Sequence, residues 1–242
     1  MFCLVFVLAY PGILYAVYTC LYLMSSSALF EKMLNTRLDR YDFIVPLVSL
    51  AAVLALILSI CDSTIHILAS AFEWPIWFDL PIYLSLSIAI FIGVSVGVAF
   101  YFFEIIISQA WLKLRMGNNP TARQWMFGET RRIVNQGQRL PIGILLGFVL
   151  SESFLEEVLW RCYLISYTTD ILNMPAQYAI AISSIAFGMN HIAYGLANVL
   201  SKTLFGAILS LLYLASDSLL PCILCHQVFN LMVFKIRIEW KS

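Results

Sequence analysis

Long apolar stretches separated by polar connections run along almost the whole chain. A helix needs about 20 apolar residues to cross the hydrocarbon core of a bilayer, so each stretch of that length predicts a membrane span. Such stretches are longer than the roughly ten residues of a membrane β-strand. The pattern therefore predicts an all-α, polytopic transmembrane helical bundle of about seven spans, at residues 2–24, 43–61, 80–103, 141–168, 176–192, 194–216 and 218–236.

The composition agrees with this class of protein. Hydrophobic residues make up 62% of the 242 residues and charged residues only 12%, whereas about 25% of an average soluble domain is charged. The formal net charge is zero, so no basic field favours nucleic acid. We expect a single membrane domain over residues 1–242, with membrane lipid as a partner and no nucleic acid.

Basic residues gather after the first span, after the third span and at the C-terminus. Because Lys and Arg accumulate in loops that stay in the cytoplasm, this distribution predicts an outside N-terminus and a cytoplasmic C-terminus. The basic connection at 112–140 is either an amphipathic helix on anionic lipid or a solvated loop. We expect a multi-pass protein of a bacterial plasma membrane, with the endoplasmic reticulum as the alternative location.

The fourth span contains an unusual concentration of charge. Glu152, Glu156, Glu157 and Arg161 all lie in this otherwise apolar stretch. On a helix Glu157 and Arg161 share a face and can pair, while Glu156 is turned by about 100° toward another partner. Ionisable groups at membrane depth usually face a bundle interior or a cavity. The segment therefore predicts a polar cavity in which one carboxylate is neutralised and the other is available.

Two later spans carry further polar residues at helical spacing. Phe187 and His191 are one turn apart, as are His226 and Asn230. A carboxylate and a His can deprotonate a water, while a second His and an Asn can donate hydrogen bonds to the oxyanion that forms at a carbonyl. Taken alone, each group could be a structural ion pair or a buried core histidine. Taken together, they predict acyl-bond hydrolysis.

The depth of these residues in the bilayer does not agree fully. At 1.5 Å per residue, Glu156 and His226 fall at similar depths, whereas His191 falls about 22 Å from the outer face. The helix that carries His191 is therefore expected to be tilted, broken or to begin later than residue 176.

The three motifs, taken in order, resemble a known family. Glu156-Glu157-x-x-x-Arg161, Phe187-x-x-x-His191 and His226-x-x-x-Asn230 are similar to the signature of the CAAX protease and bacteriocin-processing (CPBP, or Abi) family of intramembrane endopeptidases. This family is related to the Ras-converting CAAX prenyl endopeptidase. The resemblance covers residues 140–235, which would form the catalytic core.

The resemblance implies a glutamate-dependent mechanism with no obligatory metal. Glu156 would be the general base, and His191 would help to activate the water. His226 and Asn230 would form the oxyanion hole. These four residues are the predicted catalytic group.

Three residues would support the catalytic group. The resemblance implies that Glu157 pairs with Arg161 and shapes the site, and Phe187 of the second motif is the third supporting residue. Trp160 stands where many family members have Phe, and the prenyl endopeptidases are usually drawn with eight spans, so eight spans remain an alternative here.

Other functions fit some of the same residues. Two His and a Glu suit catalytic zinc, which Glu156, His191 and His226 would then hold. Cys222-x-x-Cys225-His226 matches the pattern of c-type haem attachment. A membrane scaffold, a bacteriocin-immunity protein or a transporter would use the polar residues without peptide hydrolysis. The preferred prediction is a protease with no cofactor.

The substrate is not specified by the sequence. A peptide or protein at the membrane is expected, either with a prenylated C-terminal tail, as the resemblance implies, or as a signal-like or bacteriocin leader peptide.

Overall fold

One long helical run carries the acid-rich segment. It consists of α8 (Ile142–Glu157), the π-helical turn η2 (Val158–Tyr163), the short α9 (Leu164–Ser166) and the π-helical turn η3 (Tyr167–Ile171). The computed structural model describes residues 80–111 and 141–235, together with residues 48, 50–52, 54 and 55. Within these residues all regular elements are helical, which confirms the all-α prediction for this part of the chain.

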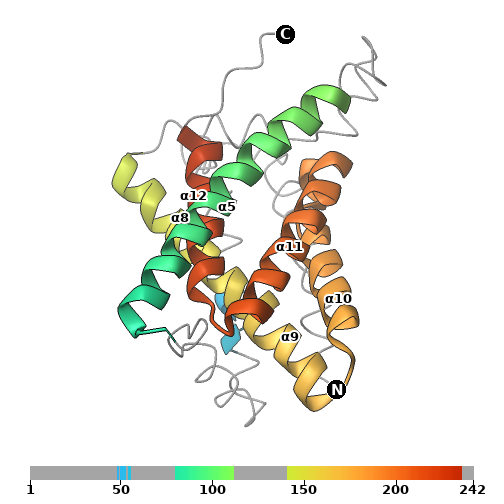
Figure 1. Cartoon of the computed structure of the whole chain (residues 1–242). Coiled ribbons are helices and arrows are strands. Elements are labelled where there is room, and N and C mark those ends of the chain that lie inside the picture. The colour runs from blue at the N-terminus through green and yellow to red at the C-terminus, as the bar shows by residue number, and fades with distance from the viewer. Residues whose placement is uncertain (1–47, 49, 53, 56–79, 112–140, 236–242) are drawn as a thin grey trace.

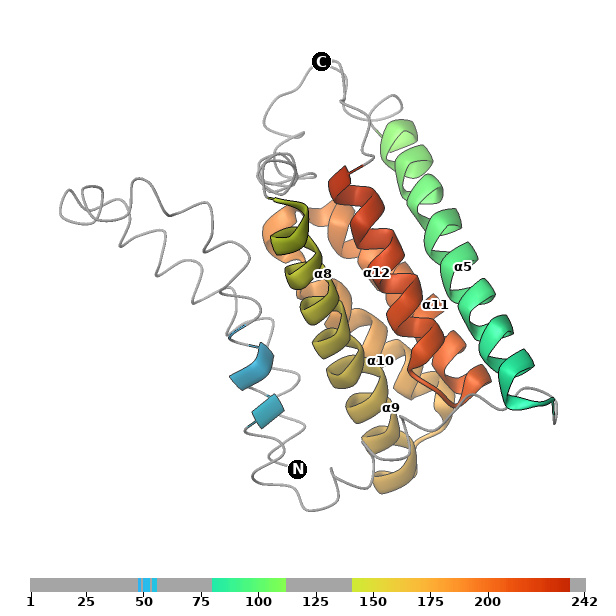
Figure 2. The ribbon, with the colours of Figure 1, turned by 90° about the vertical axis from the view of Figure 1, so that its left-hand side faces the viewer.

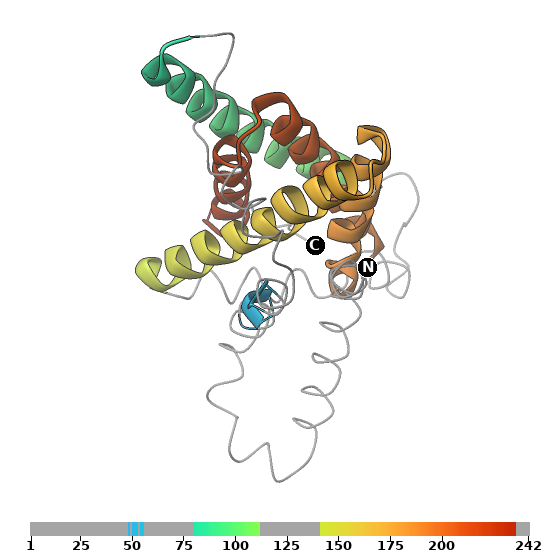
Figure 3. The same cartoon turned by 90° about the horizontal axis from the view of Figure 1, so that it is seen from below.

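The remaining elements pack around this run. They are α5 (Ile82–Trp111), α10 (Ala176–Met189), the 3₁₀ turn η4 (Ile192–Tyr194), α11 (Leu196–Ser216) and α12 (Leu220–Lys235). In Figures 1 and 2, α12 lies between α8 and α5, and α10 packs against α11. Figure 3 shows the long run from below; its first part lies beside α12 and its later part beside α10. The run therefore links the two helical pairs.

The observed helices follow the predicted spans from residue 80 onward. Two of them, at Ile82–Ala110 and Leu196–Ser216, are long and apolar enough to cross a membrane; the apolar helices at Ala176–Met189 and Leu220–Phe234 are shorter. The predicted span at 2–24 and the connection at 112–140 lie outside the described residues, as does most of the span at 43–61. The number of spans and their orientation therefore stay predictions.

Large apolar side chains cover the outer surface of α5. Tyr83, Phe91, Phe102 and Ile106 are each more than half exposed. An exposed apolar surface of this extent is unusual on a water-soluble monomer, whereas lipid tails accommodate it. The outer surface of α5 is therefore suited to contact with lipid.

Two glycines of α5 bring it very close to α12. A Cβ atom at Gly93 would lie 2.7 Å from the Pro221 carbonyl oxygen, and one at Gly97 would lie 2.5 Å from the Cys225 carbonyl oxygen. Small residues at this spacing let membrane helices approach closely. The α5–α12 contact depends on the absence of these side chains.

A second glycine pair with the same spacing behaves differently. Gly143 and Gly147 of α8 are also four residues apart, but a Cβ at either position would meet nothing within 4 Å among the described residues. Within that part of the chain, this face of α8 has no close neighbour at the two glycines. Spacing alone permits close packing and does not create a partner.

We expect Gly97→Ala to destabilise the folded protein by about 1–3 kcal/mol, because the added methyl group meets backbone that cannot move aside cheaply. Gly147→Ala is the matched control, since a Cβ there meets nothing within 4 Å among the described residues, and it should change stability by less than about 0.5 kcal/mol. Thermal unfolding in detergent micelles measures both. Equal melting temperatures for the two variants would contradict the proposed packing.

Candidate active site

Two adjacent carboxylates lie buried at the end of α8. Glu156 is 4% exposed and Glu157 is fully buried. They stand near the middle of the helical run, immediately before the first π-helical turn. Two buried acids side by side require nearby donors or positive charge, since an uncompensated buried charge is very costly. Neighbouring helices supply these groups.

Glu157 is held by one residue from its own helical run and one from α12. Its Oε1 atom lies 3.3 Å from Arg161 Nη1 and 2.6 Å from His226 Nδ1. Arg161 is also fully buried, and its guanidinium lies 4.4 Å from the centre of the Phe187 ring. The predicted pairing of Glu157 with Arg161 is therefore present, and Phe187 covers the cation.

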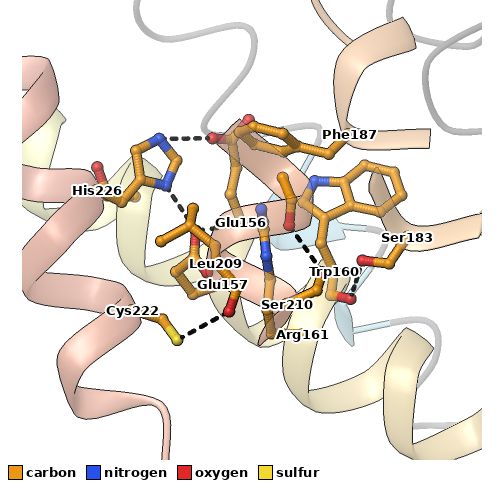
Figure 4. A network of polar contacts seen from close by, with 12 residues as sticks. Glu156, Glu157, Trp160, Arg161, Ser183, Phe187, Leu209, Ser210, Cys222 and His226 are labelled. Carbon is orange, nitrogen blue, oxygen red and sulfur yellow. Dashed lines mark hydrogen bonds and ion pairs between the residues drawn. The ribbon is translucent and has the colours of Figure 1, made fainter. Parts of the chain in front are cut away.

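His226 lies between the two acids. Its Nδ1 atom contacts Glu157, and its Nε2 atom lies 3.6 Å from Glu156 Oε2 (Figure 4). The edges of Phe187 and Phe205 enclose the imidazole, with ring centres 5.6 Å and 5.5 Å away. The position of His226 is thus fixed by two carboxylates and two aromatic rings.

Glu156 makes a further contact with the turn that follows α10. Its Oε1 atom accepts a hydrogen bond from Asn190 Nδ2 at 2.9 Å. The helix that carries His191 was expected to be tilted, broken or to begin later than residue 176. α10 begins at Ala176 and ends at Met189, so Asn190 and His191 lie in a break after the helix.

His191 lies on the same turn as Asn190, beyond the end of α10. Its Nδ1 atom bonds to the Phe187 carbonyl oxygen at 3.0 Å. A carbonyl oxygen only accepts hydrogen bonds, so Nδ1 carries the proton, and in the neutral ring Nε2 keeps its lone pair. No hydrogen bond or ion pair joins His191 to Glu156 among the described contacts. His191 thus provides a basic nitrogen from the turn next to Glu156.

Asn230 and His226 both lie on α12 and face α8. Asn230 contacts α8 one turn before Glu157. Its Nδ2 atom donates to the Ser153 hydroxyl at 3.1 Å. Asn230 and His226 therefore both point toward α8, yet they bind different residues. Their joint action on an oxyanion stays a prediction, in which His226 would use Nε2 because Nδ1 is engaged by Glu157.

Sequence reasoning missed two participants. Asn190 lies inside the second motif and Ser153 lies between Glu152 and Glu156 in the fourth span, but neither received a role. An amide at membrane depth, next to a candidate catalytic His, was an available signal for Asn190. Ser153 is one turn before Glu157, on the face that meets α12.

A second buried ion pair lies near the site. Lys202 Nζ and Ser201 Oγ both donate to Glu104 Oε2 at 3.1 Å, which joins α11 to α5. The same ammonium lies 3.7 Å from the centre of the Phe229 ring on α12. Glu104 and Lys202 therefore pair with each other between helices.

The arrangement has been compared with known proteins. Residues 138–232 match the family model described as type II CAAX prenyl endopeptidase Rce1-like. All three motifs fall inside this match, so the resemblance inferred from them is confirmed, and this part of the chain is an Rce1-like domain. No curated protein and no solved structure matches the chain. The domain and the two long apolar helices together indicate an integral membrane protein.

The metal and haem alternatives depend on how His, Cys, Asp and Glu side chains are grouped. No group of three or more His, Cys, Asp or Glu side chains in the described part of the chain is arranged to hold a metal ion. Cys222 and Cys225 are buried in α12, and the Cys222 thiol donates to the Leu209 carbonyl oxygen at 3.3 Å. These cysteines are therefore packed within the helical core.

We expect Lys202→Met to destabilise the protein by about 3–5 kcal/mol, because it leaves the Glu104 carboxylate buried without its cation. The double variant Glu104→Met with Lys202→Met should regain part of this loss, since no buried charge is then left unpaired. Thermal unfolding of the single and double variants in the same detergent measures the coupling. A double variant that melts below Lys202→Met would contradict this account.

Proposed function

We propose that this protein is an intramembrane endopeptidase that hydrolyses a peptide bond in a membrane-associated or lipidated protein or peptide. The observation that carries the proposal is the 3.6 Å approach of His226 Nε2 to Glu156 Oε2 within a buried site. A general base next to a hydrogen-bond donor is the pairing that acyl hydrolysis requires. Membership of this region in a family described as CAAX prenyl endopeptidases supports the same reaction.

In the proposed reaction Glu156 takes a proton from water as the water oxygen bonds to the scissile carbonyl carbon. The lone pair on His191 Nε2 helps to orient this water. The carbonyl π electrons move to its oxygen, and the C–N bond then breaks as Glu156 returns the proton to the leaving nitrogen. The products are a carboxylic acid and an amine, so the proton count balances.

The developing oxyanion requires donors. In its cationic form His226 donates from both nitrogens, through Nδ1 to Glu157 and through Nε2 to the oxyanion. Asn230 is the proposed second donor. Glu157 and Arg161 keep His226 in place, since Nδ1 of His226 and Nη1 of Arg161 contact the same Glu157 oxygen.

We expect Glu156→Gln to lower the rate of peptide cleavage by about 10²- to 10⁴-fold, because the amide cannot accept the proton. His191→Ala should also reduce the rate strongly. The assay uses purified protein in lipid nanodiscs with quenched fluorescent peptides, and mass spectrometry identifies the cleaved bond. The peptides are one that ends in a farnesylated Cys and three further residues, its unprenylated counterpart and a leader-like peptide.

Asp170→Asn is the matched control. It likewise converts a carboxylate to an amide, at an exposed position of η3 near the end of the helical run, and it should retain cleavage within a few fold of the wild type. Cleavage by Glu156→Gln at the wild-type rate would refute the proposed mechanism. Which peptide is cleaved decides between a prenylated tail and a leader peptide.

A non-catalytic scaffold or immunity protein is the second candidate. The observation that favours it is that the polar groups bond to one another, since Asn230 binds Ser153 and His226 binds Glu157. Such bonds could hold helices together instead of serving hydrolysis. In that case no peptide would be cleaved, and Glu156→Gln would keep the full biological effect.

We expect cleavage to be unaffected by EDTA, because the proposed base is a carboxylate and needs no metal. Rates before and after chelation, together with the zinc content of the purified protein, test this expectation. Loss of cleavage on chelation, with recovery on addition of zinc, would instead support zinc held by Glu156, His191 and His226.

A further inference from the structure

Asn190 forms a hydrogen bond with the proposed base, Glu156, although the three-motif signature gives Asn190 no role. It follows the end of α10 and donates from Nδ2 to Glu156 Oε1 at 2.9 Å. Its other polar atom, Oδ1, is buried and has no hydrogen-bond partner among the described residues. The amide is therefore directed at Glu156 alone.

The orientation of this amide follows from the chemistry of its partner. An ionised carboxylate only accepts hydrogen bonds, so the NH₂ group must face Glu156. The bond occupies Oε1 and leaves Oε2, the oxygen that lies 3.6 Å from His226 Nε2. Asn190 thus makes the two oxygens of Glu156 inequivalent.

The backbone fixes the amide in this position. The Asn190 N–H donates to the Ala186 carbonyl oxygen, and the His191 N–H donates to that of Gly188. The turn ends at Gly195, where φ is 94° and ψ is 163°, a conformation that is essentially restricted to glycine. The turn that carries Asn190 is therefore held at both ends.

We propose that Asn190 is a positioning residue for the hydrolysis described above: it holds Glu156 Oε1 so that Oε2 receives the proton from water. This inference rests on the proposed function. A positioning role affects the chemical step, so its removal should lower kcat and leave KM nearly unchanged.

Asn190→Asp and Asn190→Ala separate positioning from packing. Asp has the shape of Asn but puts an acceptor against the carboxylate, whereas Ala removes the donor without adding repulsion. We expect kcat to fall about 10- to 100-fold in the Ala variant and further in the Asp variant. If Asn190 only fills space, the Ala variant should have the lower kcat, because Asp fills the space better than Ala. That reverse order would overturn the inference.

A second pair of variants covers the case in which the Asp variant does not fold. Asn190→Gln keeps an amide donor, and Asn190→Leu has nearly the shape of Asn without one. Gln should retain at least about ten times the kcat of Leu, and equal rates would overturn the inference. Gel filtration and thermal unfolding establish that each compared variant is folded.

Asn198→Ala is the control. Asn198 donates an amide hydrogen bond to the Tyr194 carbonyl oxygen at 2.8 Å, at the start of α11, and its removal should leave kcat within about twofold. The farnesylated peptide, or whichever assay peptide the wild type cleaves, serves as substrate. If Glu156→Gln is inactive while both Asn190→Ala and Asn190→Asp match the wild type, only the role of Asn190 fails. If Glu156→Gln is fully active, the proposed function itself fails.

Discussion

The burial of two adjacent carboxylates on one helix is the constraint on which the rest of the site depends. Glu156 and Glu157 are both removed from solvent, so each must find donors or positive charge inside the bundle. Arg161 supplies charge from the same helical run, and His226 supplies a ring from α12. Asn190 completes the set from the turn after α10. Three separate segments are therefore brought together by the electrostatics of a single acid pair.

Contacts within one helix were predictable from the sequence, whereas contacts between helices were not. The pairing of Glu157 with Arg161 follows from their four-residue spacing, and the helical class follows from the apolar stretches. The position of His226 between the acids depends on how α12 packs against α8, which spacing does not specify. The contact between Asn190 and Glu156 likewise depends on how the turn after α10 packs against the helical run, which spacing does not specify.

The glycines illustrate the same limit. Gly97 and Gly147 belong to pairs of identical spacing, yet only Gly97 meets a neighbouring backbone among the described residues. The α5–α12 contact at Gly93 and Gly97 matters for the site because α12 carries His226. Glu104 on α5 also holds Lys202, whose ammonium lies on the Phe229 ring three residues after His226. A helix outside the family match thus helps to set the position of α12.

In the proposed reaction His226 and Asn230 of α12 must donate hydrogen bonds to the substrate oxyanion. Their present partners must not be left as unsatisfied buried polar groups. The two donors differ in this respect. The 2.6 Å bond from His226 to Glu157 involves a carboxylate that Arg161 also contacts, so Nδ1 stays in place and Nε2 is the nitrogen that can act. Asn230 donates to a serine hydroxyl oxygen, and after its release the serine O–H can still donate to a backbone carbonyl one turn earlier on α8. Release of Asn230 from Ser153 therefore costs little, which makes its amide the donor that can move to an oxyanion beside His226.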